Sequence, residues 1–197
     1  NHVLELAEHA SVPVVNGLTD FNHPCQIMAD IFTISEKFDS LDGITISYVG
    51  DGNNIVHSWL ELASILPINF NIVCPENFLP DMDLVEKTKN KNISSIKIFH
   101  DPYDGVLDSD VIYTDVWASM GQKKEAENRR KIFEPFQVND ALMNASGKDT
   151  IFMHCLPAER GVEVTDSVCD SPNSVIFQQA ENRMHAQNAI MLDLMKV

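Results

Sequence analysis

The sequence has 197 residues, of which 44% are hydrophobic, and a formal net charge of −15 at pH 7. This length fits one large domain, or one domain with part of another, and the hydrophobic fraction excludes a disordered chain. The negative charge excludes nucleic acid and anionic membrane surfaces as partners, because both repel an acidic protein.

The cysteines and the apolar runs also limit the class of protein. The four cysteines form no CxxC pair, so we expect reduced thiols in an intracellular compartment rather than a zinc site or a disulfide framework. No apolar run reaches the roughly 18 residues of a membrane helix. The first ten residues lack the basic and apolar regions of a secretory signal and are typical of a helix.

Short runs rich in Val, Ile and Phe predict strands. They cover residues 12–15, 44–49, 68–73, 96–99, 111–114, 151–154 and 175–177. Helical patterns fall between most of them, over residues 24–38, 55–66, 81–90, 122–133 and 181–195. This alternation predicts an α/β fold with a doubly wound, mostly parallel sheet that is covered on both faces.

The same pattern predicts four parts of the chain. Residues 1–22 form the end of a second α/β domain, and residues 23–42 form an interdomain helix. Residues 43–178 form the doubly wound domain, and residues 179–197 form a helix that packs back toward the first domain.

Polar segments follow four of the predicted strands, at residues 50–54, 115–121, 155–161 and 178–183. In open α/β sheets, ligands bind beyond the carboxyl ends of the strands. We therefore expect a binding site at this edge of the sheet.

The segment GDGNN (50–54) allows three interpretations. It could bind a dinucleotide, with Glu76 on the ribose, although Ile55 replaces the third glycine of the GxGxxG pattern. Its glycines could simply form a tight turn. Alternatively, Asn53 or Asn54 at a helix N-terminus could bind a carboxylate.

The segment FNHPCQ places His23 directly before Pro24, which is well suited to the first position of a helix. The helix dipole would favour a neutral imidazole there, able to donate a hydrogen bond to a carbonyl group. Gln26 would add a donor and an acceptor on the same face. The alternative is a plain helix cap with a solvated histidine.

Asp115 ends a predicted strand and could bind an ammonium group, and Gly121 could act as the hinge of a loop that carries Ser119 and Met120. The alternative is a helix cap beside a buried Trp117.

Cys155 follows another strand and could be a nucleophile, a metal ligand, a redox thiol or a core residue. Without a partner cysteine, the ligand and redox hypotheses have little support. Arg183 could bind an anion, or it could form a surface ion pair together with Glu181.

Together these motifs resemble the ornithine carbamoyltransferases of the aspartate/ornithine carbamoyltransferase family. The resemblance spans the whole chain and rests on HPCQ (23–26), GDGNN (50–54), DVWASMG (115–121), HCLPAERG (154–161) and AENR (180–183). Aspartate carbamoyltransferases typically have HPLP in place of HCLP, and putrescine carbamoyltransferases depart from the SMG loop.

The resemblance implies transfer of the carbamoyl group of carbamoyl phosphate to the δ-amine of L-ornithine, which gives L-citrulline and phosphate in arginine synthesis or the urea cycle. It implies no cofactor, no metal, and a homotrimer in the cytoplasm, chloroplast stroma or mitochondrial matrix. The alternatives are a carbamoyltransferase for another amine and an inactive amino-acid-binding fragment.

The resemblance also implies roles for individual residues. Carbamoyl phosphate would contact His23, Gln26, Cys155, Leu156 and Arg183. Ornithine would contact Asn54, Asp115, Ser119 and Met120. The catalytic residues would be His23, Asp115 and Cys155.

The sequence departs from the family at the phosphate-binding Ser-x-Arg-Thr motif, which it lacks. Carbamoyl phosphate is close to a dianion, and Arg183 with a neutral His23 would not balance that charge. We therefore expect the chain to be the C-terminal two-thirds of such an enzyme and to be inactive alone.

Overall fold

The computed structural model describes residues 2–117 and 126–195, and its centre is a five-stranded sheet in which every neighbouring pair of strands is parallel. The strands are β1 (Thr45–Val49), β2 (Asn69–Val73), β3 (Ser95–Phe99), β4 (Val111–Thr114) and β5 (Ile151–His154). Their order is β3-β2-β1-β4-β5. The chain therefore winds to one edge of the sheet, returns to its middle and winds to the other edge, which confirms the predicted doubly wound fold.

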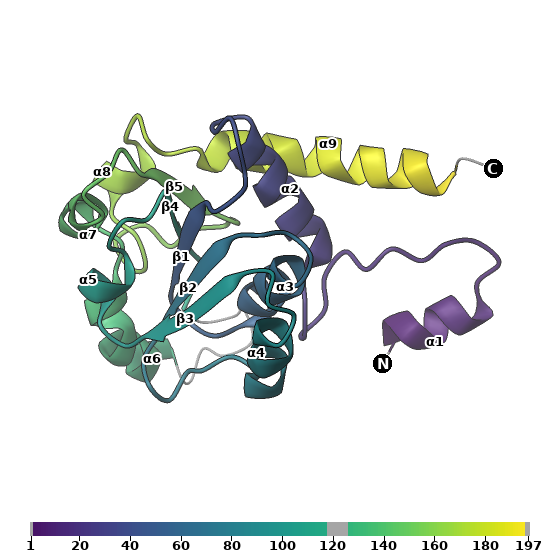
Figure 1. The fold of residues 1–197 in the computed structure, drawn as a ribbon, viewed down its shortest axis with the longest axis horizontal. Coiled ribbons are helices and arrows are strands. Elements are labelled where there is room, and N and C mark those ends of the chain that lie inside the picture. The colour runs from purple at the N-terminus through teal and green to yellow at the C-terminus, as the bar shows by residue number, and fades with distance from the viewer. Residues whose placement is uncertain (1, 118–125, 196–197) are drawn as a thin grey trace.

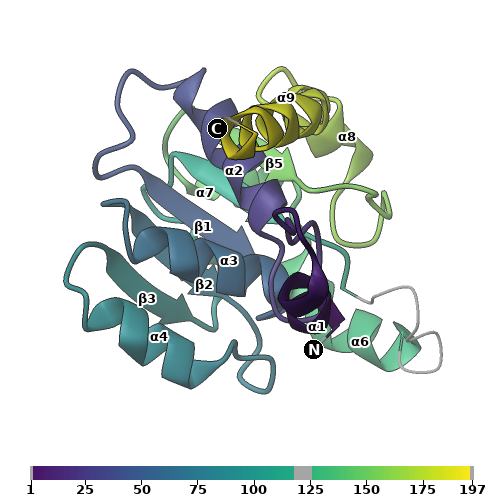
Figure 2. The same cartoon turned by 90° about the vertical axis from the view of Figure 1, so that its right-hand side faces the viewer.

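Helices cover both faces of this sheet (Figures 1 and 2). One face carries α2 (Pro24–Ser35), α3 (Asn54–Ala63), α4 (Met82–Lys89) and α9 (Ile176–Leu194). The other carries α5 (Pro102–Gly105), α6 (Ala126–Phe133), the 3-10 turn η1 (Glu134–Phe136), α7 (Asp140–Ala145) and α8 (Asp166–Cys169). A separate apolar cluster fills the space on each face, with Trp59 and Phe70 in the first and Phe133 and Phe152 in the second. Because both faces are covered, β4 is buried at every position.

Side-chain caps fix where several helices begin. Asn53 caps α3 by accepting hydrogen bonds from the amides of Ile55 and Val56, at 3.0 and 3.4 Å. Asp81, Asp101 and Asn139 cap α4, α5 and α7 in the same way. Pro24 begins α2, as expected from its fixed φ angle.

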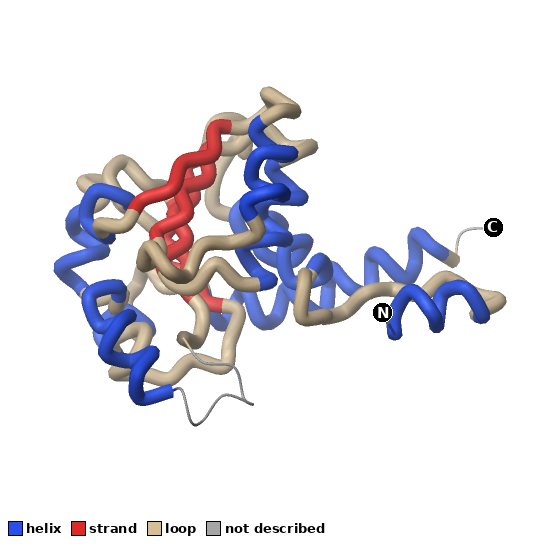
Figure 3. Tube along the Cα trace, turned by 90° about the horizontal axis from the view of Figure 1, so that it is seen from below, coloured by secondary structure: helices blue, strands red, loops and turns tan. Residues whose placement is uncertain are grey.

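Two predicted strands are wrong. Residues 12–15 form no strand, because the segment between α1 (His2–His9) and α2 extends away from the sheet, where no described strand pairs with it (Figures 1 and 3). Residues 175–177 form no strand either. Only one bridge joins Ser174 to Phe152, and α9 begins at Ile176 rather than Glu181.

The other predicted elements are present with small shifts of their ends, except that the helix predicted from residue 122 is described only from Ala126. No helix within residues 2–117 and 126–195 is long and apolar enough to cross a membrane.

Candidate active site

Three segments that follow strands meet where the direction of winding reverses. Residues 50–53 follow β1, Asp115 follows β4 and Cys155 follows β5. Neighbouring strands β1 and β4 belong to opposite halves of the winding, so their following loops diverge and leave space between them. This is the edge of the sheet at which the sequence predicts a site.

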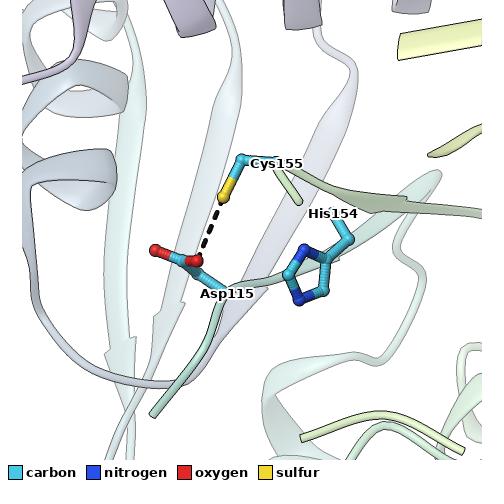
Figure 4. Close-up of side chains that lie close together, drawn as sticks. All are labelled: Asp115, His154 and Cys155. Atoms are coloured by element: carbon cyan, nitrogen blue, oxygen red, sulfur yellow. Dashed lines mark hydrogen bonds between the residues drawn. The ribbon is translucent and has the colours of Figure 1, made fainter. Parts of the chain in front are cut away.

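Asp115 is the centre of this arrangement. Its Oδ2 accepts a hydrogen bond from Nδ2 of Asn53 at 2.9 Å. Its Oδ1 accepts one from the backbone amide of Val116 at 2.8 Å and one from Sγ of Cys155 at 3.1 Å. Figure 4 shows the thiol directed at the carboxylate. Asp115 is thus held by neutral donors, and its carboxyl group can bind an ammonium group.

Cys155 is a protonated thiol in this arrangement. Burial, the charge of Asp115 and the hydrogen bond to Asp115 all raise the pKa of the thiol well above its usual value. None of the four cysteines, all of which the structure describes, forms a disulfide. At neutral pH, Cys155 therefore donates a hydrogen bond and does not act as a resting thiolate nucleophile or base.

His154, next to Cys155, holds the loop that follows β5. Its Nδ1 accepts a hydrogen bond from the amide of Leu156 at 2.9 Å, so its proton lies on Nε2, which donates to Oε1 of Glu163 at 3.2 Å. Both His154 and Glu163 are buried.

Within the described residues, Asp115, His154 and Cys155 form the one group whose possible metal-ligand atoms lie within 4.8 Å of one another. Because both nitrogens of His154 are engaged and the thiol is protonated, this group suits hydrogen bonding better than metal binding.

Leu156 has a φ of 55°, in the left-handed region that non-glycine residues rarely adopt, and a cis peptide bond joins it to Pro157. The left-handed backbone of Leu156 costs about 1–2 kcal/mol. The hydrogen bond from Leu156 to His154 supports it. The loop therefore presents Cys155 and Leu156 in a fixed geometry.

The second group of predicted site residues lies where the start of α2 meets α9. Nη1 of Arg183 donates to Oε1 of Gln26, so Arg183 does not form the alternative surface pair with Glu181. His23 lies directly before α2, and its amide donates to Oγ of Ser58 at 2.7 Å. The buried Nδ1 of His23 and Nε of Arg183 have no hydrogen-bond partner among the described residues. Such buried atoms are costly unless another group supplies a partner.

His23 is neutral, as the sequence predicts, but for other reasons. Burial and, to a smaller extent, the nearby charge of Arg183 lower the pKa of the imidazole, and the charge of Asp115 partly opposes them, so that the pKa is about 4. The negative charge of Asp115 thus acts on the imidazole of His23. A neutral imidazole can donate one hydrogen bond without giving up a cationic proton.

Asn54 is placed differently from Asn53. Its Nδ2 donates to the carbonyl oxygen of Thr19 at 2.9 Å, so it lies against the segment before α2. Asn53, rather than Asn54, forms the hydrogen bond with Asp115. Oδ1 of Asn53 accepts a hydrogen bond from Oη of Tyr48 at 3.2 Å. The predicted residues Ser119 and Met120 lie outside the described residues.

The turn after β1 is packed against protein rather than open to a nucleotide. A Cβ at Gly52 would lie 2.3 Å from the backbone nitrogen of Pro80. Asp51 beside it forms an ion pair with Arg129 of α6, whose Nε donates to the carbonyl oxygen of Trp117. The acidic side chain of Asp51 and the close packing at Gly52 therefore give no support to the dinucleotide interpretation of this segment.

Comparison with known proteins assigns the chain to a family. Residues 42–194 match the family model described as the Asp/Orn binding domain of aspartate/ornithine carbamoyltransferase, and residues 1–36 match its carbamoyl-P binding domain. The chain is 59% identical over 193 residues to the chloroplastic ornithine carbamoyltransferase of Pisum sativum, covering 98% of the chain and 52% of that protein. It is 56% identical over 192 residues to the ornithine carbamoyltransferase of Thermococcus kodakarensis, covering 96% of the chain and 61% of that protein.

A solved structure agrees with these matches. The ornithine carbamoyltransferase from Pyrococcus furiosus superposes with a TM-score of 0.90 and 51% identity, covering 96% of this chain and 61% of that one. The chain thus spans between 52% and 61% of the length of these relatives. It belongs to the aspartate/ornithine carbamoyltransferase family.

Proposed function

We propose that this chain carries the ornithine-binding part of an ornithine carbamoyltransferase, which converts carbamoyl phosphate and L-ornithine to L-citrulline and phosphate in arginine biosynthesis. The observation that carries the proposal is the juxtaposition of Asp115, held by Asn53 and Cys155, with the group formed by His23, Gln26 and Arg183. The first can bind a cationic amino acid, and the second offers a cation and hydrogen-bonding groups to an anion.

The balance of charge supports a division of the site between this chain and further basic groups. Arg183 of α9 supplies a positive charge beside the start of α2, and His23 is neutral. Together they do not balance the charge of a ligand that is close to a dianion. The match to the carbamoyl-P binding domain covers residues 1–36 only. We therefore propose that other residues of that domain complete the phosphate site.

The proposed mechanism needs no covalent intermediate. The δ-ammonium of ornithine has a lysine-like pKa near 10 and must lose a proton before its nitrogen attacks. With the amine held roughly 3–3.5 Å from the carbamoyl carbon, the N–C bond forms and the C–O bond to phosphate breaks. The first proton is lost to solvent as the amine enters the site, and the second, released from the nitrogen once the N–C bond forms, passes to the departing phosphate. Cys155, being protonated, lines the pocket and does not remove that proton.

Neutral His23 would stabilise the oxyanion that develops on the carbamoyl oxygen, by donating a hydrogen bond to it. Asp115 would hold the α-ammonium of ornithine. Because Asn54, Ser119 and Met120 are proposed on the family resemblance, their contacts with ornithine are tested most directly by substitution.

The test is to compare ornithine, putrescine and N-acetylornithine as acceptors for carbamoyl phosphate, using the protein at its full natural length. We expect ornithine to be preferred. The Asp115→Asn variant should lower kcat/KM for ornithine roughly 10- to 150-fold, the range expected for one hydrogen bond to a charged group. It should have little effect on N-acetylornithine, whose α-nitrogen carries no charge.

A matched control is Asp104→Asn, which removes an exposed carboxylate on α5 and should leave all three rates unchanged. A preference for putrescine over ornithine would contradict the proposed substrate. Assembly as a homotrimer, which the family resemblance implies, stays a prediction that sedimentation of the full-length protein would test.

A further inference from the structure

A buried carboxylate, Asp30, lies on α2 one turn beyond Gln26 and has no part in the mechanism above. It is 0% exposed and receives three hydrogen bonds. Nε2 of Gln26 and Nε2 of Gln179 both donate to its Oδ1 at 2.7 Å, and Oη of Tyr113 donates to its Oδ2 at 2.9 Å. These partners come from α2, α9 and β4, so Asp30 joins three elements beneath the site.

The contacts of Gln26 allow one orientation of its amide. Its NH2 group donates to Asp30, and its oxygen accepts from Nη1 of Arg183. With the amide turned over, the NH2 group would face the donors of Arg183 and the oxygen would face the carboxylate of Asp30. Both of those contacts are repulsive.

Resting on the proposed function, we infer that Asp30 is a positioning residue that holds the oxygen of Gln26 toward the carbamoyl phosphate site and so makes that site select a ligand with an N–H donor. The carbonyl oxygen of Gln26 has two lone pairs and uses one for Arg183. The second can accept from the NH2 group of a carbamoyl ligand.

Asp30 orients a second amide in the same way. Nε2 of Gln179 donates to Asp30, and its Oε1 accepts from the backbone amide of His154 at 2.9 Å. His154 directly precedes Cys155. One carboxylate therefore fixes two amides, one on α2 and one on α9, and the amide on α9 contacts the end of β5.

The hydrogen bonds show which form of Asp30 fits this role. Each of its three described partners acts as a donor toward it, and a protonated carboxyl would need an acceptor. Burial raises the pKa of Asp30, and its three hydrogen bonds and the charge of Arg183 partly oppose this effect, so that the pKa is about 7. The carboxylate therefore dominates in mildly alkaline solution, where the test is best made.

The test uses two ligands that differ at one group. Carbamoyl phosphate carries NH2 where acetyl phosphate carries CH3. The wild-type protein, at its full natural length and pH 8, should bind carbamoyl phosphate at least about 10-fold more tightly, because acetyl phosphate leaves the oxygen of Gln26 without its second partner. Both dissociation constants can be measured by calorimetry, and the inhibition constant of acetyl phosphate by kinetics.

We expect Asp30→Asn to reduce this preference about 10-fold or to abolish it, because an asparagine can no longer force the orientation of Gln26. Tyr113→Phe is the matched control. It removes another donor to the same carboxylate but leaves the Gln26 contact, so the preference should stay within about twofold of the wild type. A loss of preference in Tyr113→Phe equal to that in Asp30→Asn would overturn the assignment and indicate a general structural role.

The outcomes separate this inference from the proposed function. If the wild type fails to bind carbamoyl phosphate, both the proposed function and this inference are wrong. If the wild type prefers carbamoyl phosphate and a folded Asp30→Asn variant keeps the same preference, only the inference falls. Should Asp30→Asn fail to fold, hydrogen exchange of the 15N-labelled Gln26 side-chain amide in the wild type decides. Slow exchange supports the bond to Asp30, and exchange at the solvent rate overturns it.

Discussion

Substitution of Gly52 by alanine should damage both the fold and the site. A Cβ at this position would lie 2.3 Å from the nitrogen of Pro80, 2.5 Å from the carbonyl carbon of Leu79 and 2.7 Å from the carbonyl oxygen of Phe78. All three are backbone atoms, so no side chain can move aside. To restore a separation of 3.0 Å, the closest distance that real Cβ atoms show, the two loops must part by at least about 0.7 Å.

The cost can be estimated from these contacts. Overpacking in a tight site costs about 1–3 kcal/mol, and the 2.9 Å hydrogen bond from the amide of Gly52 to Phe78 contributes about 1 kcal/mol more. We therefore expect a loss of about 2–4 kcal/mol, which corresponds to a fall in Tm of roughly 5–15 °C for a protein of this size. The shift also moves the neighbouring Asn53 away from Asp115, so ornithine binding should weaken with it.

Thermal melts and urea unfolding of the protein at its full natural length measure the effect. Gly17→Ala is the control, because a Cβ there meets nothing within 4 Å and the residue does not have a left-handed φ. It should change stability by less than about 0.5 kcal/mol. If Gly52→Ala changed stability no more than Gly17→Ala, the close packing of the two loops would be refuted.

Two further predictions concern titrating groups. Asp115→Asn should speed the alkylation of Cys155 by iodoacetamide several-fold near neutral pH, because the Asp115 carboxylate helps to raise the pKa of the thiol. Peptide mass spectrometry measures the rate of alkylation, and an unchanged rate would contradict this electrostatic explanation. For His23, the folded-state pKa of about 4 lies below the unfolded value of 6.5, so the unfolded state binds the proton first as the pH falls. The free energy of unfolding of the wild type, relative to that of His23→Gln, should therefore fall by about 1–2 kcal/mol between pH 6.5 and 4, after allowance for the partial exposure of His23. A difference between the two proteins that stays constant with pH in urea unfolding would refute this prediction.

The sheet was predictable where burial on both faces leaves an unbroken apolar run. Residues 111–114 are such a run and form β4, buried at every position. The run at 12–15 is also short and apolar, but a strand needs a neighbour to pair with, and composition carries no information about that neighbour. At residues 175–177, a single bridge beside β5 is too short to hold a strand against the start of α9.

The part of the site that follows strands was also predictable. The carboxyl ends of parallel strands share one edge of the sheet, so Asp115 and Cys155 were expected at the same edge, and the pairing of β4 with β5 brings them together. The buried polar residues beneath the site were not predictable. Asp30 and Gln179 occupy helical core positions and are 149 residues apart in the chain, so no local pattern links them. A polar residue at a core position is the one signal that could have drawn attention to Asp30.

The ring of His154 has a consequence for how this protein can change through evolution. One imidazole fixes the chain at Leu156 through one nitrogen and at Glu163 through the other. Glu163 also accepts from the amide of Glu159. The intervening residues 159–161 are exposed. Mutations of Glu159 and Arg160 can alter the charge and shape of the outer surface while the contacts of His154 and Glu163 stay in place, whereas the left-handed backbone of Gly161, with a φ of 81°, keeps that position a glycine. The outer part of this loop is free to adapt while its inner part keeps the chemistry constant.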